Sequence, residues 1–307
     1  RERGIKSFVP VEYWSIEAKL SSEKKEHAGK IFTAKLEKIG KDKAEIKNRD
    51  QAEGIRQEIL NPPCKVLKVD KNERRRKSYA PYTTSKLQQE AYNRLGFPAA
   101  KTMRVAQKLY EGIEIGDEGS AGLITYMRTD SVNVAKSAEA EVIEYIRQKF
   151  GAGYLPKEPP VYRSKKGAQE AHEAIRPTSA QREPKSVRQY LADDEYKLYE
   201  LIWQKFVASQ MAPAVDEHVS AVIGAGEKYF FKATGRVNLF PGFSVVFEEA
   251  KAQRENKEEK KEEKQDGEGP EPLSELPLLT AGEILKLHEL MGYQHFTKPP
   301  ARYNDAS

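Results

Sequence analysis

The first seventy residues alternate apolar and polar positions in the manner of half-buried strands. This alternation covers residues 13–20 and 31–39, and side chains two positions apart in a strand lie on the same face. Residues 64–69 predict a further strand, and residues 50–60 predict a short helix before it that a pair of prolines stops. The basic run 74–77 is interpreted as a loop. This part of the chain is therefore predicted to be mostly β.

From about residue 81 the apolar positions repeat with the period of a helix. Helices are predicted over residues 85–95, 99–110, 137–150 and 194–210. Thr84 or Ser85 could cap the first helix, Ser85 together with Gln88 as a capping box, and Gly96 would end it. The first two helices, joined by a turn that contains glycine, are compatible with a helix-turn-helix, but the pattern alone favours an ordinary helical hairpin.

Strand-like alternation returns over residues 217–247, with the last strand predicted at 243–247 and Gly or Pro in the turns. Residues 255–269 then consist almost wholly of Glu, Lys, Gln, Asp and Gly. Such a composition cannot bury enough apolar surface to order itself. We therefore expect a solvated insertion here, followed by ordered structure over residues 270–290.

Composition narrows the classes of protein that fit. The chain has 307 residues and a net charge of +5, which predicts two or three domains and is compatible with a polyanionic partner. Its single cysteine, Cys64, excludes a disulfide framework and a cysteine-ligated metal site, and suits a reducing, cytoplasmic compartment. No apolar run approaches about 18 residues, so no membrane partner is expected. Both ends of the sequence suggest a part of a larger protein.

Two short segments concentrate reactive side chains. Residues 122–131, Gly-Leu-Ile-Thr-Tyr-Met-Arg-Thr-Asp-Ser, are named here the tyrosine segment, and residues 170–178, Glu-Ala-His-Glu-Ala-Ile-Arg-Pro-Thr, the histidine segment. On extended backbone Tyr126 and Arg128 share a face, so a guanidinium could grip a phosphate that the phenol attacks. On a helix His172 and Arg176 would share a face and supply a second grip. From the residues alone, packing and a solvated, charged surface are the commoner explanation of these patterns.

The tyrosine segment resembles the active-site motif of type IA DNA topoisomerases, and the histidine segment resembles the motif that accompanies it. Three further landmarks resemble the same family in the same order. They are residues 1–14, the helical tract 81–103 that begins Pro-Tyr-Thr-Thr-Ser-Lys-Leu-Gln-Gln-Glu-Ala, and residues 294–303, Gln-His-Phe-Thr-Lys-Pro-Pro-Ala-Arg-Tyr. The Thr-Tyr-Met-Arg and Glu-Ala-His-Glu forms are more similar to the topoisomerase I branch of bacteria than to the topoisomerase III branch.

The resemblance implies roles for individual residues. Tyr126 matches the nucleophile that forms a 5′-phosphotyrosyl link, and Arg128 matches the arginine on the scissile phosphate. His172 matches a histidine that orients the strand, and Arg302 matches an arginine that contacts DNA. Weaker assignments to DNA binding fall on Thr125, Glu173 and Arg176, and Glu173 could instead hold a neighbouring cation.

The resemblance also implies what this chain lacks. The family holds Mg²⁺ on an Asp-x-Asp-x-Glu cluster of a Toprim domain, and that pattern does not occur in this sequence. No nucleotide-binding Gly-x-x-x-x-Gly-Lys-Ser/Thr loop occurs either, as expected for ATP-independent relaxation of negatively supercoiled DNA. We expect the chain alone to bind single-stranded DNA as a monomer, without full activity. Its partners would be that DNA and the missing Toprim and gate-base domains, at the nucleoid.

The predicted architecture is α+β and multi-domain, the central fold of type IA topoisomerases. A helical, winged-helix-like domain that carries Tyr126 is expected to be inserted in a mostly β arch. The expected segments are 1–14 from a gate-base domain, 15–78 and 211–278 from the arch, 79–210 from the helical domain, and 279–307 from the gate-base domain again.

Two other classes remain open at this point. One is a non-catalytic module that binds single-stranded DNA. The other is a tyrosine recombinase or a replication-initiation nuclease. In a recombinase the Arg and His partners precede the tyrosine, whereas His172 and Arg176 follow Tyr126. An initiation nuclease needs a His-x-His metal motif, which this sequence lacks.

Overall fold

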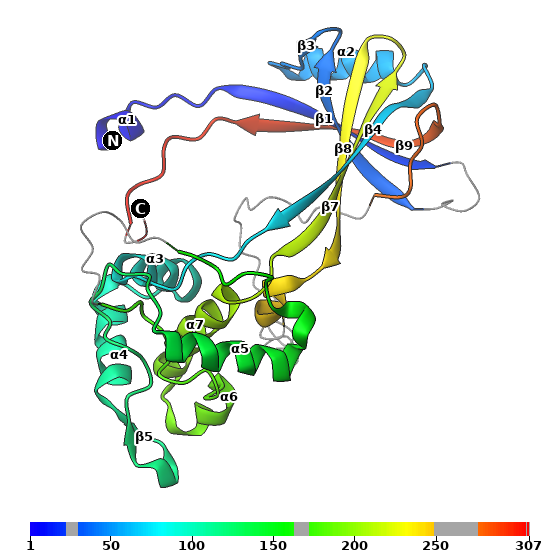
Figure 1. Cartoon of the computed structure of the whole chain (residues 1–307). Helices are drawn as coiled ribbons and strands as arrows, with labels where there is room; N and C mark the ends of the chain where they lie inside the picture. The colour runs from blue at the N-terminus through cyan, green and yellow to red at the C-terminus, as the bar shows by residue number, and fades with distance from the viewer. Residues whose placement is uncertain (23–29, 163–171, 249–275, 305, 307) are drawn as a thin grey trace. The chain divides into compact units, whose positions relative to one another are not determined.

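The computed structural model describes residues 1–22, 30–162, 172–248, 276–304 and 306 (Figure 1). It divides into two compact units. The sheet unit comprises residues 1–74, 216–239 and 264–302, and the helical unit comprises residues 75–215, 240–263 and 303–307. The predicted insertion at 255–269 lies outside the described residues. The α+β class is confirmed, because the large sheet is built from antiparallel strand pairs and helices dominate the other unit.

The sheet unit is built on one seven-stranded sheet with the order β1-β9-β4-β7-β8-β2-β3. The bounds of its strands are β1 Glu12–Ser22, β2 Ile31–Ile39, β3 Asp42–Lys43, β4 Cys64–Arg76, β7 Ala214–Ala225, β8 Tyr229–Phe240 and β9 Ile284–Phe296. Because β1 also pairs with β2, six of these strands close into a ring. The core of the unit lies inside that ring, with Ile16, Ala18 and Leu20 fully buried along β1.

One helix of regular length belongs to the sheet unit, within the residues described. This helix, α2 (Arg49–Ile59), begins at Asn48, whose side chain accepts a hydrogen bond from the backbone N–H of Gln51. It contacts β1 and β9 and buries Ala52 and Ile59. A short helix, α1 (Glu2–Lys6), precedes the first strand.

Strand β9 pairs with the first strand of the chain. The antiparallel register runs from Glu12 opposite Phe296 to Ser22 opposite Leu285. Parts of the two segments expected for a gate-base domain, residues 12–14 and 284–296, therefore lie in the large sheet. Antiparallel partners so far apart in sequence leave no local signal, and the predicted domain boundaries stay predictions.

Two further expectations for this part of the chain are wrong. The run 74–77 is no loop, because β4 continues to Arg76 beside β7 with exposed side chains. Backbone pairing sustains a strand without apolar alternation. Residues 243–247, predicted to be a strand, begin instead with a 3-10 turn, η4 (Gly242–Ser244), and continue as helix.

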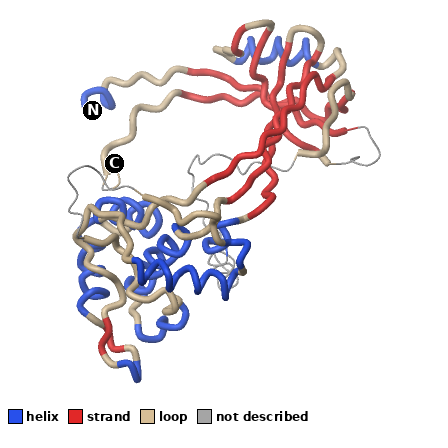
Figure 2. Tube along the Cα trace, in the orientation of Figure 1, coloured by secondary structure: helices blue, strands red, loops and turns tan. Residues whose placement is uncertain are grey.

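The helical unit packs its helices around one long buried helix, α7 (Asp193–Ser209). The others are α3 Thr84–Leu95, α4 Ala99–Glu111, α5 Lys136–Phe150 and α6 Pro184–Val187. Helices α3 and α4 contact each other and both contact α7, as expected for two helices joined at Gly96. Figure 2 shows the small hairpin of β5 (Ile113–Glu114) and β6 (Ser120–Ala121) as strand within this unit. The tyrosine segment follows β6 directly.

Helix α3 begins one residue earlier than the predicted capping box. Its N-cap is Thr83, whose side chain accepts a hydrogen bond from the backbone N–H of Lys86. At the other end Gly96 adopts the left-handed conformation, with φ of 66°, that a glycine at this position permits. Thr84 thus becomes the first residue of the helix, and its side chain is available for other contacts.

Candidate active site

The tyrosine segment exposes alternate side chains. Tyr126 is 46% exposed and Arg128 is also exposed, whereas Met127 and Thr129 between and beyond them are buried. Alternate residues of an extended chain project to opposite sides. Both side chains are thus accessible at the surface, and their orientation toward the same side stays a prediction.

The start of the tyrosine segment is fixed to the end of α4. The backbone N–H of Leu123 donates to the carbonyl of Leu109 at 2.7 Å, and Leu123 itself is fully buried. Gly122 lies so close to the same helix that a Cβ there would stand 2.7 Å from the carbonyl oxygen of Tyr110. The ring of Tyr110 meets that of Tyr126 edge to face, with centroids 5.4 Å apart.

The histidine segment lies beside the tyrosine segment in antiparallel register. Ile124 forms a bridge with Pro177. The Thr125 backbone N–H donates to the Arg176 carbonyl at 2.9 Å, and the Thr125 hydroxyl donates to the Ala174 carbonyl at 2.7 Å. Two motifs about fifty residues apart in sequence thus meet through Thr125. Its hydroxyl serves this pairing, and the DNA contact predicted for Thr125 stays a prediction.

The described part of the histidine segment, residues 172–178, is not helical. The expectation that His172 and Arg176 share a helix face is therefore wrong. A residue before proline disfavours helical backbone, and Arg176 precedes Pro177. The segment is also bridged to Tyr82 through Ile175. His172 itself is exposed, two residues from Ala174.

Arg176 is a structural residue rather than an exposed cation. It is 9% exposed, its Nε and Nη2 atoms donate to Glu173 Oε2, and its Nη1 atom donates to the Pro177 carbonyl at 2.9 Å. The expectation that Glu173 holds a neighbouring cation is confirmed. The donors of the Arg176 guanidinium are engaged within the chain by these contacts. The DNA contacts predicted for Arg176 and Glu173 stay predictions.

This ion pair leads to a prediction about stability. Replacing Glu173 by Ala should lower the free energy of unfolding by about 1–3 kcal/mol, because the buried guanidinium of Arg176 loses its acceptor. The measurement is urea unfolding of the isolated chain. Glu144→Ala is the matched control, since Glu144 pairs with Arg147 on the surface of α5 and should change stability by less than about 1 kcal/mol. Equal effects of the two substitutions would contradict the structural role of the Glu173 pair.

Arg302 lies in the sheet unit, whereas Tyr126 lies in the helical unit. It is exposed and its Nε atom stands 2.9 Å from Glu2 Oε1. Its predicted contact with DNA stays a prediction. The Glu2 pair shows only that residues near the two ends of the chain meet within the sheet unit.

Exposure distinguishes Tyr126 from the buried tyrosines of the same unit. Burial raises the pKa of Tyr82 and of Tyr199 well above the ordinary value, and burial raises that of Tyr162 to about 12. The hydroxyls of Tyr162 and Tyr199 donate to backbone carbonyls, those of Ser209 and Arg182. Tyr126, by contrast, is 46% exposed.

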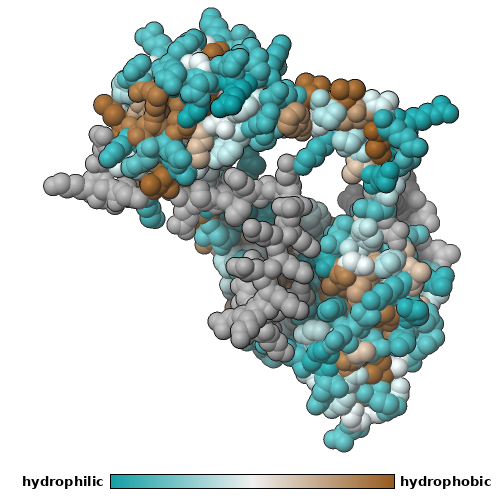
Figure 3. Space-filling model, turned by 180° about the vertical axis from the view of Figure 1, so that it is seen from behind, coloured by the Kyte–Doolittle hydropathy of each residue, from teal (hydrophilic) through white to brown (hydrophobic). Residues whose placement is uncertain are grey.

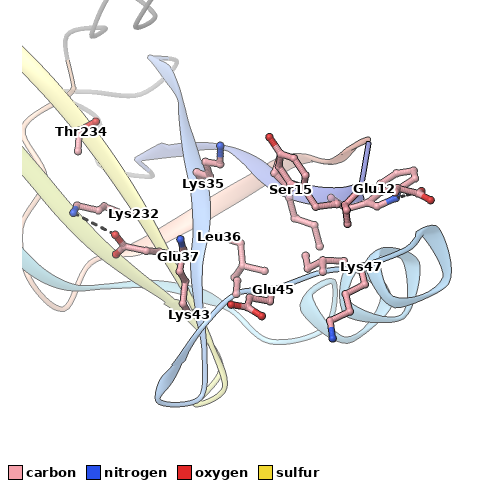
Figure 4. Close-up of a pocket in the computed structure, with 16 residues that line it drawn as sticks. Glu12, Ser15, Lys35, Leu36, Glu37, Lys43, Glu45, Lys47, Lys232 and Thr234 are labelled. Carbon is pink, nitrogen blue, oxygen red and sulfur yellow. Dashed lines mark hydrogen bonds and ion pairs between the residues drawn. The ribbon is translucent and has the colours of Figure 1, made fainter. Parts of the chain in front are cut away.

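A separate pocket of about 940 Å³ occurs in the sheet unit (Figure 4). Residues from β1, β2, β8 and the β3 region line it, and Lys232 pairs with Glu37 at its edge. None of the residues predicted for the active site lines this pocket. On the face seen in Figure 3, the surface is largely hydrophilic, with smaller apolar areas.

Across the part of the chain that the structure describes, no three or more His, Cys, Asp or Glu side chains are grouped so that they could hold a metal ion. Nor does any described helix have the length and apolar character needed to cross a membrane.

Comparison with known proteins assigns the class. A family model described as DNA topoisomerase matches residues 1–307, so the chain belongs to the DNA topoisomerase family, and its fold matches that of the type IA enzymes. The full-length topoisomerase I of Thermotoga maritima superimposes with a TM-score of 0.74 at 34% identity, over 99% of this chain and 44% of that one.

Curated relatives narrow the family branch. The chain is 43% identical over 314 residues to DNA topoisomerase 1 of Xylella fastidiosa (strain 9a5c), and 41% identical over 312 residues to DNA topoisomerase 1 of Rickettsia felis. Each alignment covers 100% of this chain, but only 37% and 38% of the respective relatives. The chain thus spans less than two fifths of the length of these proteins.

Proposed function

We propose that this chain is the part of a type IA topoisomerase that supplies the nucleophile for transient cleavage of one DNA strand. The observation that carries the proposal is the tyrosine segment, which exposes both Tyr126 and Arg128 while its residues Met127 and Thr129 are buried. The whole protein would relax negatively supercoiled DNA by passing a strand through the reversible break.

The proposed reaction exchanges one phosphodiester for another. The Tyr126 oxygen loses its proton and bonds to phosphorus, and the bond from phosphorus to the 3′ oxygen of the preceding nucleotide breaks. That oxygen leaves as a 3′-hydroxyl after it accepts a proton from a general acid. The two esters are of similar energy, so the step is reversible without ATP. Religation is the same exchange in the opposite direction.

Arg128 and His172 have separate roles in this proposal. The Arg128 guanidinium is exposed two residues beyond Tyr126, and would bind the non-bridging phosphate oxygens and stabilise their charge in the transition state. His172 is exposed near the line where the histidine and tyrosine segments pair, and would bind and orient the strand. Arg302 would contact DNA from the sheet unit.

The described residues contain no group of three or more His, Cys, Asp or Glu side chains that could hold a metal ion. We therefore derive no step through the metal. The general acid and the Mg²⁺ site would come from the Toprim domain of the whole protein, as the family resemblance implies.

The polarity of the break tests this proposal. Full-length protein is incubated with an oligonucleotide labelled at either its 3′ or its 5′ end, and protein-linked DNA is separated on a denaturing gel. Attachment to a 5′ phosphate predicts that the 3′-labelled piece migrates with the protein and that the 5′-labelled piece is released. The reverse distribution, or no linked DNA with either label, would contradict the proposal.

Binding by the isolated chain gives a further prediction. It should prefer single-stranded to duplex DNA. Its affinity should fall as salt rises, and a plot of the logarithm of the binding constant against the logarithm of the salt concentration should have a slope of about −0.7 per phosphate contacted. Arg128→Ala should weaken binding several-fold. Arg147→Ala removes an equal charge from the surface of α5 and should weaken it less. Fluorescence anisotropy measures both, and equal losses would indicate a generic basic surface.

A further inference from the structure

The backbone between Tyr126 and Asp130 is held by a single residue from another element, Thr84. The Thr84 hydroxyl lies 2.8 Å from the Met127 carbonyl oxygen and 3.1 Å from that of Thr129, and its one proton can be donated to either. The same hydroxyl accepts a hydrogen bond from the Thr129 backbone N–H at 2.8 Å. The Thr84 backbone N–H donates to the Thr129 carbonyl at 2.9 Å.

The position of Thr84 explains why it can make all these contacts. Backbone N–H groups in the first turn of a helix have no partner within the helix. Thr83 caps α3, and Thr84 is the first helical residue. Its N–H and its hydroxyl are thus both available to the tyrosine segment. Helix α3 is itself anchored, because Leu87 and Ala91 are fully buried in the core of the helical unit.

The two residues held by these contacts, Met127 and Thr129, are neighbours in sequence of the two exposed side chains. Met127 separates Tyr126 from Arg128, and Thr129 follows Arg128 directly. A backbone rotation at either held residue would change the direction of the phenol or the guanidinium. Near-attack geometry is sensitive to such shifts, and a displacement of about 1 Å can cost about 100-fold in rate.

We propose that Thr84 is a positioning residue for strand cleavage, which orients Tyr126 and Arg128 through the Met127 carbonyl and the Thr129 backbone. This inference rests on the proposed role of Tyr126. Thr84 itself touches neither DNA nor the reacting atoms in this assignment. Its hydroxyl is the group that matters, so serine should replace it and valine, of nearly the same shape, should not.

The test compares Thr84→Val, Thr84→Ser and Thr83→Val in the full-length protein. Thr83→Val is the matched control, since it removes the neighbouring hydroxyl and the cap of α3 but none of the contacts with the tyrosine segment. Single-turnover cleavage of a 3′-labelled oligonucleotide gives the rate, anisotropy gives the affinity for single-stranded DNA, and urea unfolding gives the stability.

The expected result is a loss of cleavage rate of about 10- to 100-fold for Thr84→Val, with an affinity within about 3-fold of wild type. Thr84→Ser and Thr83→Val should each cleave within about 3-fold of wild type. Wild-type cleavage by Thr84→Val would overturn the proposal. So would an equal loss in Thr83→Val, because a loss of stability would then explain both.

A second measurement separates this proposal from the role of Tyr126 and does not depend on the valine variant folding. Amide exchange of Thr129 in the isolated chain should be faster in Thr84→Ala than in wild type, and unchanged in Thr84→Ser. Unchanged exchange in Thr84→Ala would refute the positioning contact. If exchange changes as expected but Tyr126→Phe still cleaves DNA, the contact stands and the proposed function fails instead.

Discussion

Replacing Tyr126 by Phe in the full-length protein should abolish DNA relaxation, with a loss of at least about 10³-fold. The substitution removes the one attacking oxygen and leaves the ring, so the edge-to-face contact with Tyr110 remains. Because the side chain is 46% exposed, the folded state should lose little stability. A loss of activity would then be due to the missing phenolic oxygen and not to unfolding.

The measurement is relaxation of negatively supercoiled plasmid, followed on an agarose gel over a range of protein concentrations. Tyr110→Phe is the matched control, since it deletes a hydroxyl from the neighbouring ring and should retain activity. Single-stranded DNA should still bind to Tyr126→Phe with nearly the wild-type affinity. Residual relaxation by this variant at a tenth of the wild-type rate would show that another group attacks the phosphate.

The second large effect concerns the isolated chain, which should neither cleave nor relax DNA. Arg128 lies two residues beyond Tyr126, but no metal site of three or more side chains occurs among the described residues. The proposed reaction also needs a general acid to protonate the leaving 3′ oxygen. The chain covers only 37% of a relative such as that of Xylella fastidiosa. We expect the missing groups to lie in the remainder.

Complementation tests this expectation. The missing N-terminal part, added covalently or in trans together with Mg²⁺, should restore both cleavage and relaxation. The Tyr126→Phe form of the chain, added in the same way, should restore neither. Cleavage by the isolated chain without Mg²⁺ or a partner would contradict the account of it as an incomplete enzyme.

The spacing of apolar residues predicted helices and strands well where the buried positions recur with a single period. The alternation over residues 13–20 and 31–39 corresponds to β1 and β2, and the helical period corresponds to α3, α4, α5 and α7. The pattern failed where pairing between distant segments decides the structure. The exposed half of β4 is a strand because β7 lies beside it, and no alternation marks it in the sequence.

At the candidate site, too, local spacing was informative and pairing between distant segments was not foreseen. The two-residue spacing was informative at Tyr126 and Arg128, because both are exposed while Met127 between them is buried. Spacing misled at Arg176, where Pro177 and pairing with the tyrosine segment exclude the helix that we assumed. Thr84 was considered only as a helix cap. Residues 83–85 all carry hydroxyl groups. Because a helix needs only one of them as its N-cap, the other two could have suggested a contact with another segment.

The attachment site itself provides the most direct test of the central claim. Full-length protein is trapped on a single-stranded oligonucleotide, the adduct is digested with protease and nuclease, and the peptide that retains a nucleotide is sequenced by tandem mass spectrometry. The account predicts one modified peptide, with a 5′-phosphate-linked nucleotide on the phenolic oxygen of Tyr126. A nucleotide on any other residue of the chain, or a link through a 3′ phosphate, would contradict it.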